Sequence, residues 1–66
     1  MSGLQIAINR ACNACLLGDR RLTNWEREFL QSLMDRRIVD RPEKLSEKQA
    51  EVIHRIAAKV QDVLPL

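Results

Sequence analysis

The feature that most constrains the fold is one residue pattern that occurs twice, at 22–33 and again at 45–56. Each copy begins with Leu, continues with Thr or Ser, and places Glu or Gln three positions after that hydroxyl residue. This order is the capping box, in which two side chains bond each other's backbone N–H groups at the start of a helix. Apolar residues follow at matching offsets in both copies. The pattern therefore predicts two amphipathic helices that are capped by Thr23 and Ser46.

Hydrophobic periodicity predicts three helices in all, over residues 3–17, 23–39 and 46–64. In each segment the apolar side chains gather on one face of the predicted helix. The predicted buried residues are Leu4, Ile8, Ala11, Cys12 and Cys15, then Leu22, Trp25, Phe29, Leu30, Leu33 and Met34, then Gln49, Ala50, Val52, Ile53, Ile56, Ala57, Val60, Val63 and Leu64. The third face spans nearly half the helix, which is typical of a central helix with two neighbours.

Two connectors separate these helices. Gly18 supplies the left-handed residue that ends many helices, and a polar turn follows it. Pro42 disfavours a helical conformation at Arg41, so the helical pattern is interrupted there. Short connectors favour antiparallel neighbours, and a chain of 66 residues is too short for more than one domain. The predicted fold class is all-α, a small three-helix bundle that occupies residues 1–66 as a single helical domain.

The composition narrows the classes of function. Eleven Lys or Arg residues oppose nine Asp or Glu residues, with both signs interspersed, whereas a dedicated nucleic-acid binder of this size is usually more one-sided. No stretch reaches the roughly 18 apolar residues of a membrane-spanning helix. The N-terminal stretch does not have the charge order of a secretory signal. We expect a cytoplasmic protein with no membrane partner.

Cys12-x-x-Cys15 is the motif closest to known site chemistry. Zinc needs four ligands, and His54 is the one further Cys or His residue in the sequence, so a site within one copy would be short of a ligand. A thioredoxin-like redox motif would need a strand before it and a surrounding βαβ pattern. Both thiols lie on the predicted apolar face, where Cys packs as a small hydrophobic residue. Core thiols are the preferred interpretation, ahead of a redox pair or intermolecular disulfide and of a metal shared across a dimer. No metal or cofactor is assigned.

Two sets of polar side chains are candidates for a binding surface. Trp25 lies in the first turn of the second predicted helix, near Arg20 and Arg21. It either covers one end of the core or anchors a protein partner, because Trp and Arg are over-represented at interaction hot spots. His54 is expected to be an exposed, ordinary histidine, with a pH switch or a ligand role as the alternative. A second set of basic residues forms either solvated helix faces or, together with Arg20 and Arg21, phosphate contacts: Arg36, Arg37, Arg41, Lys48, Arg55 and Lys59.

From Leu22 onward, about two-thirds of the chain follows the pattern Leu22-Thr23-x-Trp25-Glu26-x-x-Phe29-Leu30-x-Ser32-Leu33, then Leu45-Ser46-x-Lys48-Gln49-x-x-x-Ile53-x-Arg55-Ile56-x-x-Lys59. This pattern resembles one found in a loose family of small phage and bacterial proteins and in tail segments of larger proteins. Members often occur with DNA replication and recombination functions. The resemblance leaves out the cysteine-bearing first helix. It implies a helical accessory module attached to nucleic-acid processing, and no particular activity.

The expected function is that of a non-enzymatic helical adaptor or inhibitor that binds a larger protein; the resemblance implies a phage origin and a link to nucleic-acid processing. No catalytic residue is assigned, because catalytic groups usually converge in a concave pocket and so small a bundle has little room for one. The alternative is a weak, sequence-nonspecific nucleic-acid-binding accessory protein. Ile6 and Leu17 lie off the main apolar face. They are either a frayed end and an exposed Leu, or a second contact surface, so a homodimer is a separate expectation.

Overall fold

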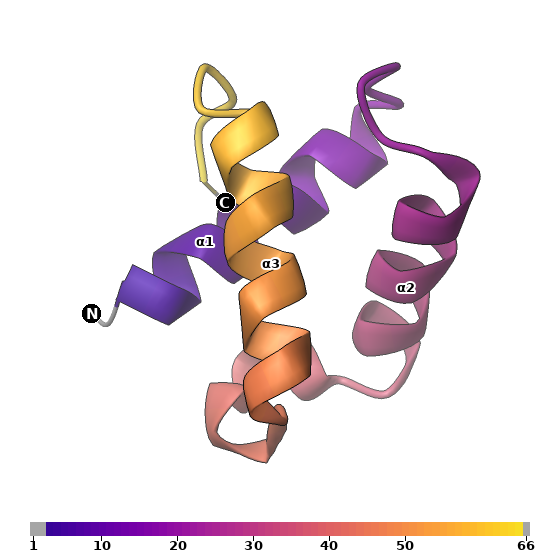
Figure 1. The fold of residues 1–66 in the computed structure, drawn as a ribbon. Helices are drawn as coiled ribbons and strands as arrows, with labels where there is room; N and C mark the ends of the chain where they lie inside the picture. The colour runs from indigo at the N-terminus through magenta and orange to yellow at the C-terminus, as the bar shows by residue number, and fades with distance from the viewer. Residues whose placement is uncertain (1–2, 66) are drawn as a thin grey trace.

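The computed structural model describes residues 3–65. Within this range the chain forms three α-helices and two short 3₁₀ turns, without a β-strand (Figure 1). The elements are, in chain order, α1 (Gly3–Leu16), α2 (Asn24–Asp35), η1 (Ile38–Asp40), η2 (Pro42–Lys44) and α3 (Glu47–Lys59). The predicted fold class, a small all-α three-helix bundle, is confirmed. The first helix ends one residue earlier than predicted, and the other two end earlier by a wider margin.

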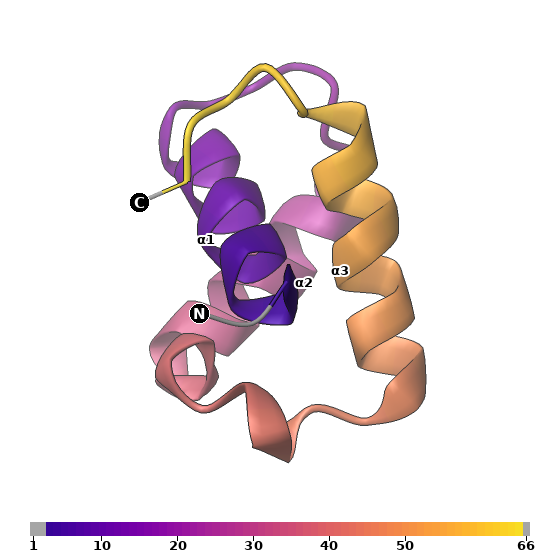
Figure 2. The same ribbon diagram turned by 90° about the vertical axis from the view of Figure 1, so that its left-hand side faces the viewer.

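The central helix of the bundle is α1. It packs against α3 along one side and against α2 and η1 along another, whereas α2 and α3 contact each other only slightly. In Figure 2, α2 and α3 diverge toward the connector that joins them. The prediction that the third helix is central was therefore wrong. The buried face of α1 contains the small side chains of Ala7, Ala11 and Ala14, which let two helices approach it closely.

The core is aliphatic and draws on all three helices. Its largest fully buried side chains are those of Ile8, Leu30, Ile53, Ile56 and Val60. Full burial of one such side chain contributes roughly 1.5–3 kcal/mol to folding. Two residues that were predicted to be buried are exposed instead, Trp25 by 60% and Leu64 by 77%. Trp25 is not a lid on the core, because Glu26 takes the inward position in the first turn of α2.

Both predicted capping boxes are present. At the start of α2, the Glu26 N–H donates to the Thr23 hydroxyl at 3.1 Å, and the Thr23 N–H donates to the Glu26 carboxylate at 2.8 Å. At the start of α3, the Gln49 N–H donates to the Ser46 hydroxyl at 3.1 Å, and the Ser46 N–H donates to the Gln49 side chain at 2.9 Å. Each box satisfies N–H groups that a helix start leaves unpaired. The predicted left-handed residue after the first helix is also present, with φ of 71° at Gly18.

The second helix ends at Asp35, earlier than the predicted end at residue 39. Arg37 adopts a left-handed backbone, with φ of 58° and ψ of 24°, which reverses the direction of the chain. Ile38 and Val39 then pack from η1 as partly buried side chains against the core. The hydrophobic residues that suggested a longer helix therefore reach the core from a separate turn.

The third helix ends at Lys59 instead of residue 64, because the chain after it folds back along α1. Two polar side chains of α1 hold this returning segment. Arg10 Nε donates to the Val63 carbonyl at 2.9 Å, and the Asn13 side-chain amide donates to the Leu64 carbonyl at 2.7 Å. The last carbonyls of a helix have no donor within the helix, and here α1 supplies donors for the carbonyls of the returning segment.

One ion pair links the start of α2 to the end of α3. Glu26 is only 8% exposed, and Lys59 Nζ lies 2.6 Å from its Oε1 atom and 3.2 Å from the Arg21 carbonyl oxygen. Burial by itself raises the pKa of Glu26, but the hydrogen bonds from Lys59 and from the Thr23 N–H outweigh burial, so the pKa lies below its ordinary value. Glu26 is therefore charged at neutral pH, where it both caps a helix and cross-links two helices.

Replacing Lys59 with Met is expected to lower the free energy of unfolding by about 1–2 kcal/mol at pH 7, because the buried Glu26 carboxylate loses its cation. A carboxyl group with a lowered pKa stabilises the fold above its ordinary pKa of 4.5, and this stability is lost as the pH falls through the lower folded-state pKa. The deficit of Lys59→Met should therefore shrink between pH 7 and pH 3. Urea unfolding at both pH values measures it. Lys48→Met, which removes an exposed ammonium, is the control, and equal losses in both variants at pH 7 would contradict the role of the pair.

Replacing Arg37 with Gly is expected to raise the free energy of unfolding by up to about 1 kcal/mol, because Gly adopts the left-handed backbone without strain from a Cβ atom. The neighbouring Arg36 has a right-handed backbone with φ of −88°, so Arg36→Gly is the matched control. That change should lower stability by about 0.5 kcal/mol through the greater freedom of the unfolded chain. Chemical denaturation of the two variants compares them, and a shift of the same sign in both would rule out strain at Arg37.

Candidate functional site

The basic side chains fall into two groups, and the first group is engaged within the fold. Arg21 pairs with Asp19 at 2.7 Å and with Asp62 at 2.6 Å, and the Arg21 guanidinium lowers the pKa of Asp19 to about 2. Arg27 donates to the Asp19 carbonyl at 2.9 Å, and Lys59 binds Glu26, as described above. Two residues of the predicted binding sets, Arg21 and Lys59, therefore have intramolecular partners.

The second group consists of exposed basic side chains that form no hydrogen bond or ion pair within residues 3–65: Arg20, Arg36, Arg37, Arg41, Lys44, Lys48 and Arg55. The fold distributes them over three places. Arg20 lies in the α1–α2 connector, and Lys48 and Arg55 lie on the exposed side of α3. The remaining four lie between the end of α2 and the end of η2. The predicted basic set is thus divided among separate surfaces.

The four basic residues between α2 and α3 line one concave surface, the connector site. Its lining residues are Arg36, Arg37, Ile38, Asp40, Arg41 and Lys44, around a hollow of about 580 Å³. Sequence analysis had grouped three of these basic residues and missed Lys44. Its proximity to the others depends on the left-handed turn at Arg37 and on the two 3₁₀ turns. The sequence signal that pointed to Lys44 was weak: one more cation, two residues after Pro42, in a stretch that already held Arg36, Arg37 and Arg41.

Large apolar side chains are exposed around the α1–α2 connector. Leu16 is 64% exposed, Leu17 is 70% exposed and Trp25 is 60% exposed. The Trp25 ring stacks on that of Phe29, with centroids 5.4 Å apart and an interplanar angle of 4°. Arg20 is the free cation of the same connector. We call this surface, made of Leu16, Leu17, Arg20 and Trp25, the Trp25 corner.

The side chains proposed as a second contact surface lie apart from one another. Leu17 is exposed at the end of α1, whereas Ile6 is half-buried within α1 and is not at a frayed end. Ile6 borders a shallow hollow between α1 and α3 that also includes Arg10 and the exposed His54. Neither cysteine lines this hollow, so the structure does not bring His54 together with the thiols there.

The two cysteines form no disulfide with each other, and they differ in burial. Cys12 belongs to the core, and burial, followed by the neighbouring Cys15, raises its pKa to about 11. A thiol with so high a pKa is protonated at neutral pH and is a poor nucleophile. Cys15 is half-buried, with its Sγ atom 4.0 Å from the Arg27 carbonyl oxygen. Within residues 3–65, no group of three or more His, Cys, Asp or Glu side chains is arranged to hold a metal ion.

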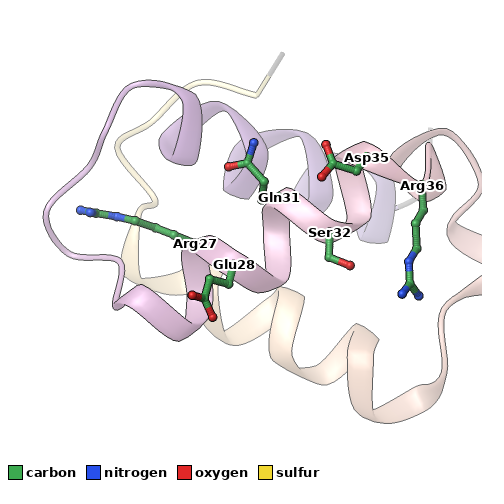
Figure 3. Close-up of a pocket in the computed structure, with 6 residues that line it drawn as sticks. All are labelled: Arg27, Glu28, Gln31, Ser32, Asp35 and Arg36. Atoms are coloured by element: carbon green, nitrogen blue, oxygen red, sulfur yellow. The ribbon is translucent and has the colours of Figure 1, made fainter.

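A further hollow lies on the outer face of α2 and is drawn in Figure 3. Its lining residues are Arg27, Glu28, Gln31, Ser32, Asp35 and Arg36, all from the last three turns of one helix and its C-cap. Gln31 and Asp35 point to one side of the helix, whereas Glu28 and Ser32 point to the other (Figure 3). These side chains do not converge on a shared point, as the groups of an acid–base or nucleophilic site do.

A thiol reagent at pH 8 is expected to modify Cys15 in the folded protein and to modify Cys12 only after unfolding. The physical reason is the burial of Cys12 and its raised pKa, which together leave almost no accessible thiolate. Mass spectrometry of the alkylated peptides, with and without urea, measures both rates. Cys15→Ser is the control that isolates Cys12. Equal rates for the two thiols under native conditions would show that Cys12 is not a core residue.

The Trp25 corner and the connector site are the two surfaces of the described chain on which unused binding groups gather. No helix within residues 3–65 is long and apolar enough to cross a membrane. Comparison of the chain with protein-family models, curated proteins and solved structures found no match. What the chain binds is therefore inferred from the side chains of these two surfaces.

Proposed function

We propose that the protein is a non-enzymatic adaptor or inhibitor that binds a larger protein through the Trp25 corner. The observation that supports the proposal is the 60% exposure of Trp25, the largest side chain of the bundle. Leu16 and Leu17 are exposed at the end of the preceding helix. Large apolar side chains exposed on both sides of one connector are compatible with a protein–protein contact there.

The geometry of Trp25 suits an interaction anchor. Its ring is stacked on Phe29, so the indole is held in place before a partner arrives. A pre-ordered aromatic ring loses little conformational freedom on binding, and Trp is among the residues most enriched at hot spots. The matching partner surface has an apolar pocket that accepts an indole ring.

The cations of this corner have different roles. Arg20 is exposed and has no partner among residues 3–65, so it is available to a carboxylate on the rim of the partner's pocket. Arg21, which the sequence placed in the same role, holds the connector through Asp19 and Asp62. We therefore assign Arg20 to the contact and Arg21 to its support.

The link to nucleic-acid processing and the phage origin are proposals that rest on the family resemblance. Trp25 and Phe29 belong to the resembling pattern, whereas Leu16, Leu17 and Arg20 precede it. A cytoplasmic location is part of the same proposal. The alternative, a nucleic-acid binder that uses the whole predicted basic set, is less well supported, because Arg21 and Lys59 are engaged and the other cations lie on separate surfaces.

Trp25→Ala is expected to weaken binding of the partner about 30-fold or more, the effect of losing a hot spot worth at least about 2 kcal/mol. The partner is first captured from host cell extract on the immobilised wild-type chain, then purified for titration calorimetry. Arg20→Gln should weaken binding less, and Arg55→Gln, the same change on α3, should have no effect.

Circular dichroism is expected to show that Trp25→Ala remains folded, because the side chain is mostly exposed. If the variant binds the captured protein as tightly as the wild type does, the Trp25 corner is not the contact. Sedimentation of the chain alone tests whether a second copy of the chain binds at the Trp25 corner. Self-association that Trp25→Ala abolishes would assign the corner to a homodimer instead of a larger protein.

A further inference from the structure

The connector site gathers more positive charge than the fold uses. Four basic side chains and one carboxylate, Asp40, line the hollow, which leaves a net charge of +3 around it. Asp40 lies within 4.0 Å of none of these cations, and none of the four side chains donates a hydrogen bond within residues 3–65. Like charges that line one hollow repel each other. The lining of the hollow therefore favours a negatively charged ligand, since the acidic residues Asp35 and Glu43 of the same stretch do not line it.

Helix electrostatics account for only part of this cluster. Arg36 and Arg37 follow the last turn of α2, where cations interact favourably with the negative end of the helix dipole. Arg41 lies between the two 3₁₀ turns and Lys44 lies at the end of η2, in the stretch that runs between α2 and α3 along the bottom of Figure 2. The helix end provides no reason for these two cations to border the same hollow.

The backbone at Arg37 adds a second, independent observation. Its left-handed conformation is the one non-glycine case among the described residues, at a position where Gly would be free of strain. A strained residue that persists at the edge of a charged hollow is the kind of feature that is over-represented at binding sites. Here the strain places a guanidinium group on the rim.

We propose that the connector site binds the phosphodiester backbone of nucleic acid. Guanidinium groups donate forked hydrogen bonds to phosphate oxygens, and a lysine adds a point charge. The site is an open hollow of about 580 Å³ with cations spread around its rim, which suits an extended polyanion better than one enclosed phosphate. No aromatic side chain lines it for bases to stack on, so we assign its contacts to the phosphates.

This site goes beyond the proposed protein contact, because the two occupy opposite ends of α2. Trp25 lies in the first turn of the helix and Arg36 follows its last residue, about 16 Å apart along the axis at 1.5 Å per residue. A protein at the Trp25 corner and a nucleic acid at the connector site therefore do not compete for the same surface. The chain would hold a protein partner close to a phosphate backbone.

The test is fluorescence anisotropy of the full chain with a labelled 20-nucleotide DNA, single-stranded and duplex, at several salt concentrations. Replacing both Arg41 and Lys44 with Gln is expected to weaken binding at least tenfold at low salt. It should also reduce the slope of log K against log salt by about 1 for each cation removed. The matched control is the pair Lys48→Gln and Arg55→Gln, which removes the same charge from α3 and should change affinity less than about threefold.

Arg37→Gly distinguishes binding from folding. This variant should be more stable than the wild type and yet bind DNA more weakly, a combination that damage to the fold does not produce. The charge-retaining pair Arg41→Lys and Lys44→Arg should restore most of the affinity. Trp25→Ala should leave DNA binding unchanged, and a loss there would place the contact at the other end of α2 and overturn the proposal.

Three further results would also overturn it. One is the absence of DNA binding by the wild type at low salt. Another is an equal loss in the connector and α3 double variants, which would reduce the effect to overall charge. The third is binding of a labelled phosphopeptide by the wild type, lost in the connector double variant, with no binding of DNA. That result would assign the site to a phosphorylated protein.

Discussion

The structure depends on a carboxylate that does two tasks at one place. Glu26 accepts the N–H of Thr23 and thereby starts α2, and the same Oε1 atom accepts a hydrogen bond from Lys59 at the end of α3. Since α2 and α3 otherwise touch only slightly, this contact holds the start of α2 against the end of α3. Toward the connector between them the two helices diverge (Figure 2). The inward position of Glu26 also turns its neighbour Trp25 outward, so the exposure of the proposed anchor follows from the placement of the ion pair.

The polar residues of α1 hold the irregular segments in place by donating hydrogen bonds to their carbonyl oxygens. Gln5 donates to the Val39 carbonyl at 2.9 Å, and Arg10 and Asn13 donate to the returning chain after α3. A short protein with two early helix ends exposes carbonyls that need donors. Because a central helix reaches both ends of the molecule, its side chains supply these donors where α2 and α3 cannot. The apolar side chains of α1 pack in the core, and its polar side chains bind the backbone of the irregular segments.

Local signals in the sequence predicted the helix starts, and tertiary contacts decided the helix ends. The caps at Thr23 and Ser46 depend on residues three positions apart, so they were predictable. The left-handed turn at Arg37 was not predicted, because no glycine marks that position in the sequence. The inward turn of Glu26 was missed because carboxylates are rarely buried unless paired, and its partner lies 33 residues away. For the candidate sites, Trp25, Arg20 and three connector arginines were named from sequence. The separation of Arg21 and Lys59 from them depends on long-range bonds.

The pairing of α1 with α3 joins the first helix of the chain to the last. Contacts between segments so distant in sequence form only after a long loop has closed, which costs chain entropy before any burial repays it. During synthesis, α1 emerges while α3, its main packing partner, is still absent. The side of α1 that packs on α3 is therefore exposed until α3 leaves the ribosome, and this part of the core assembles last.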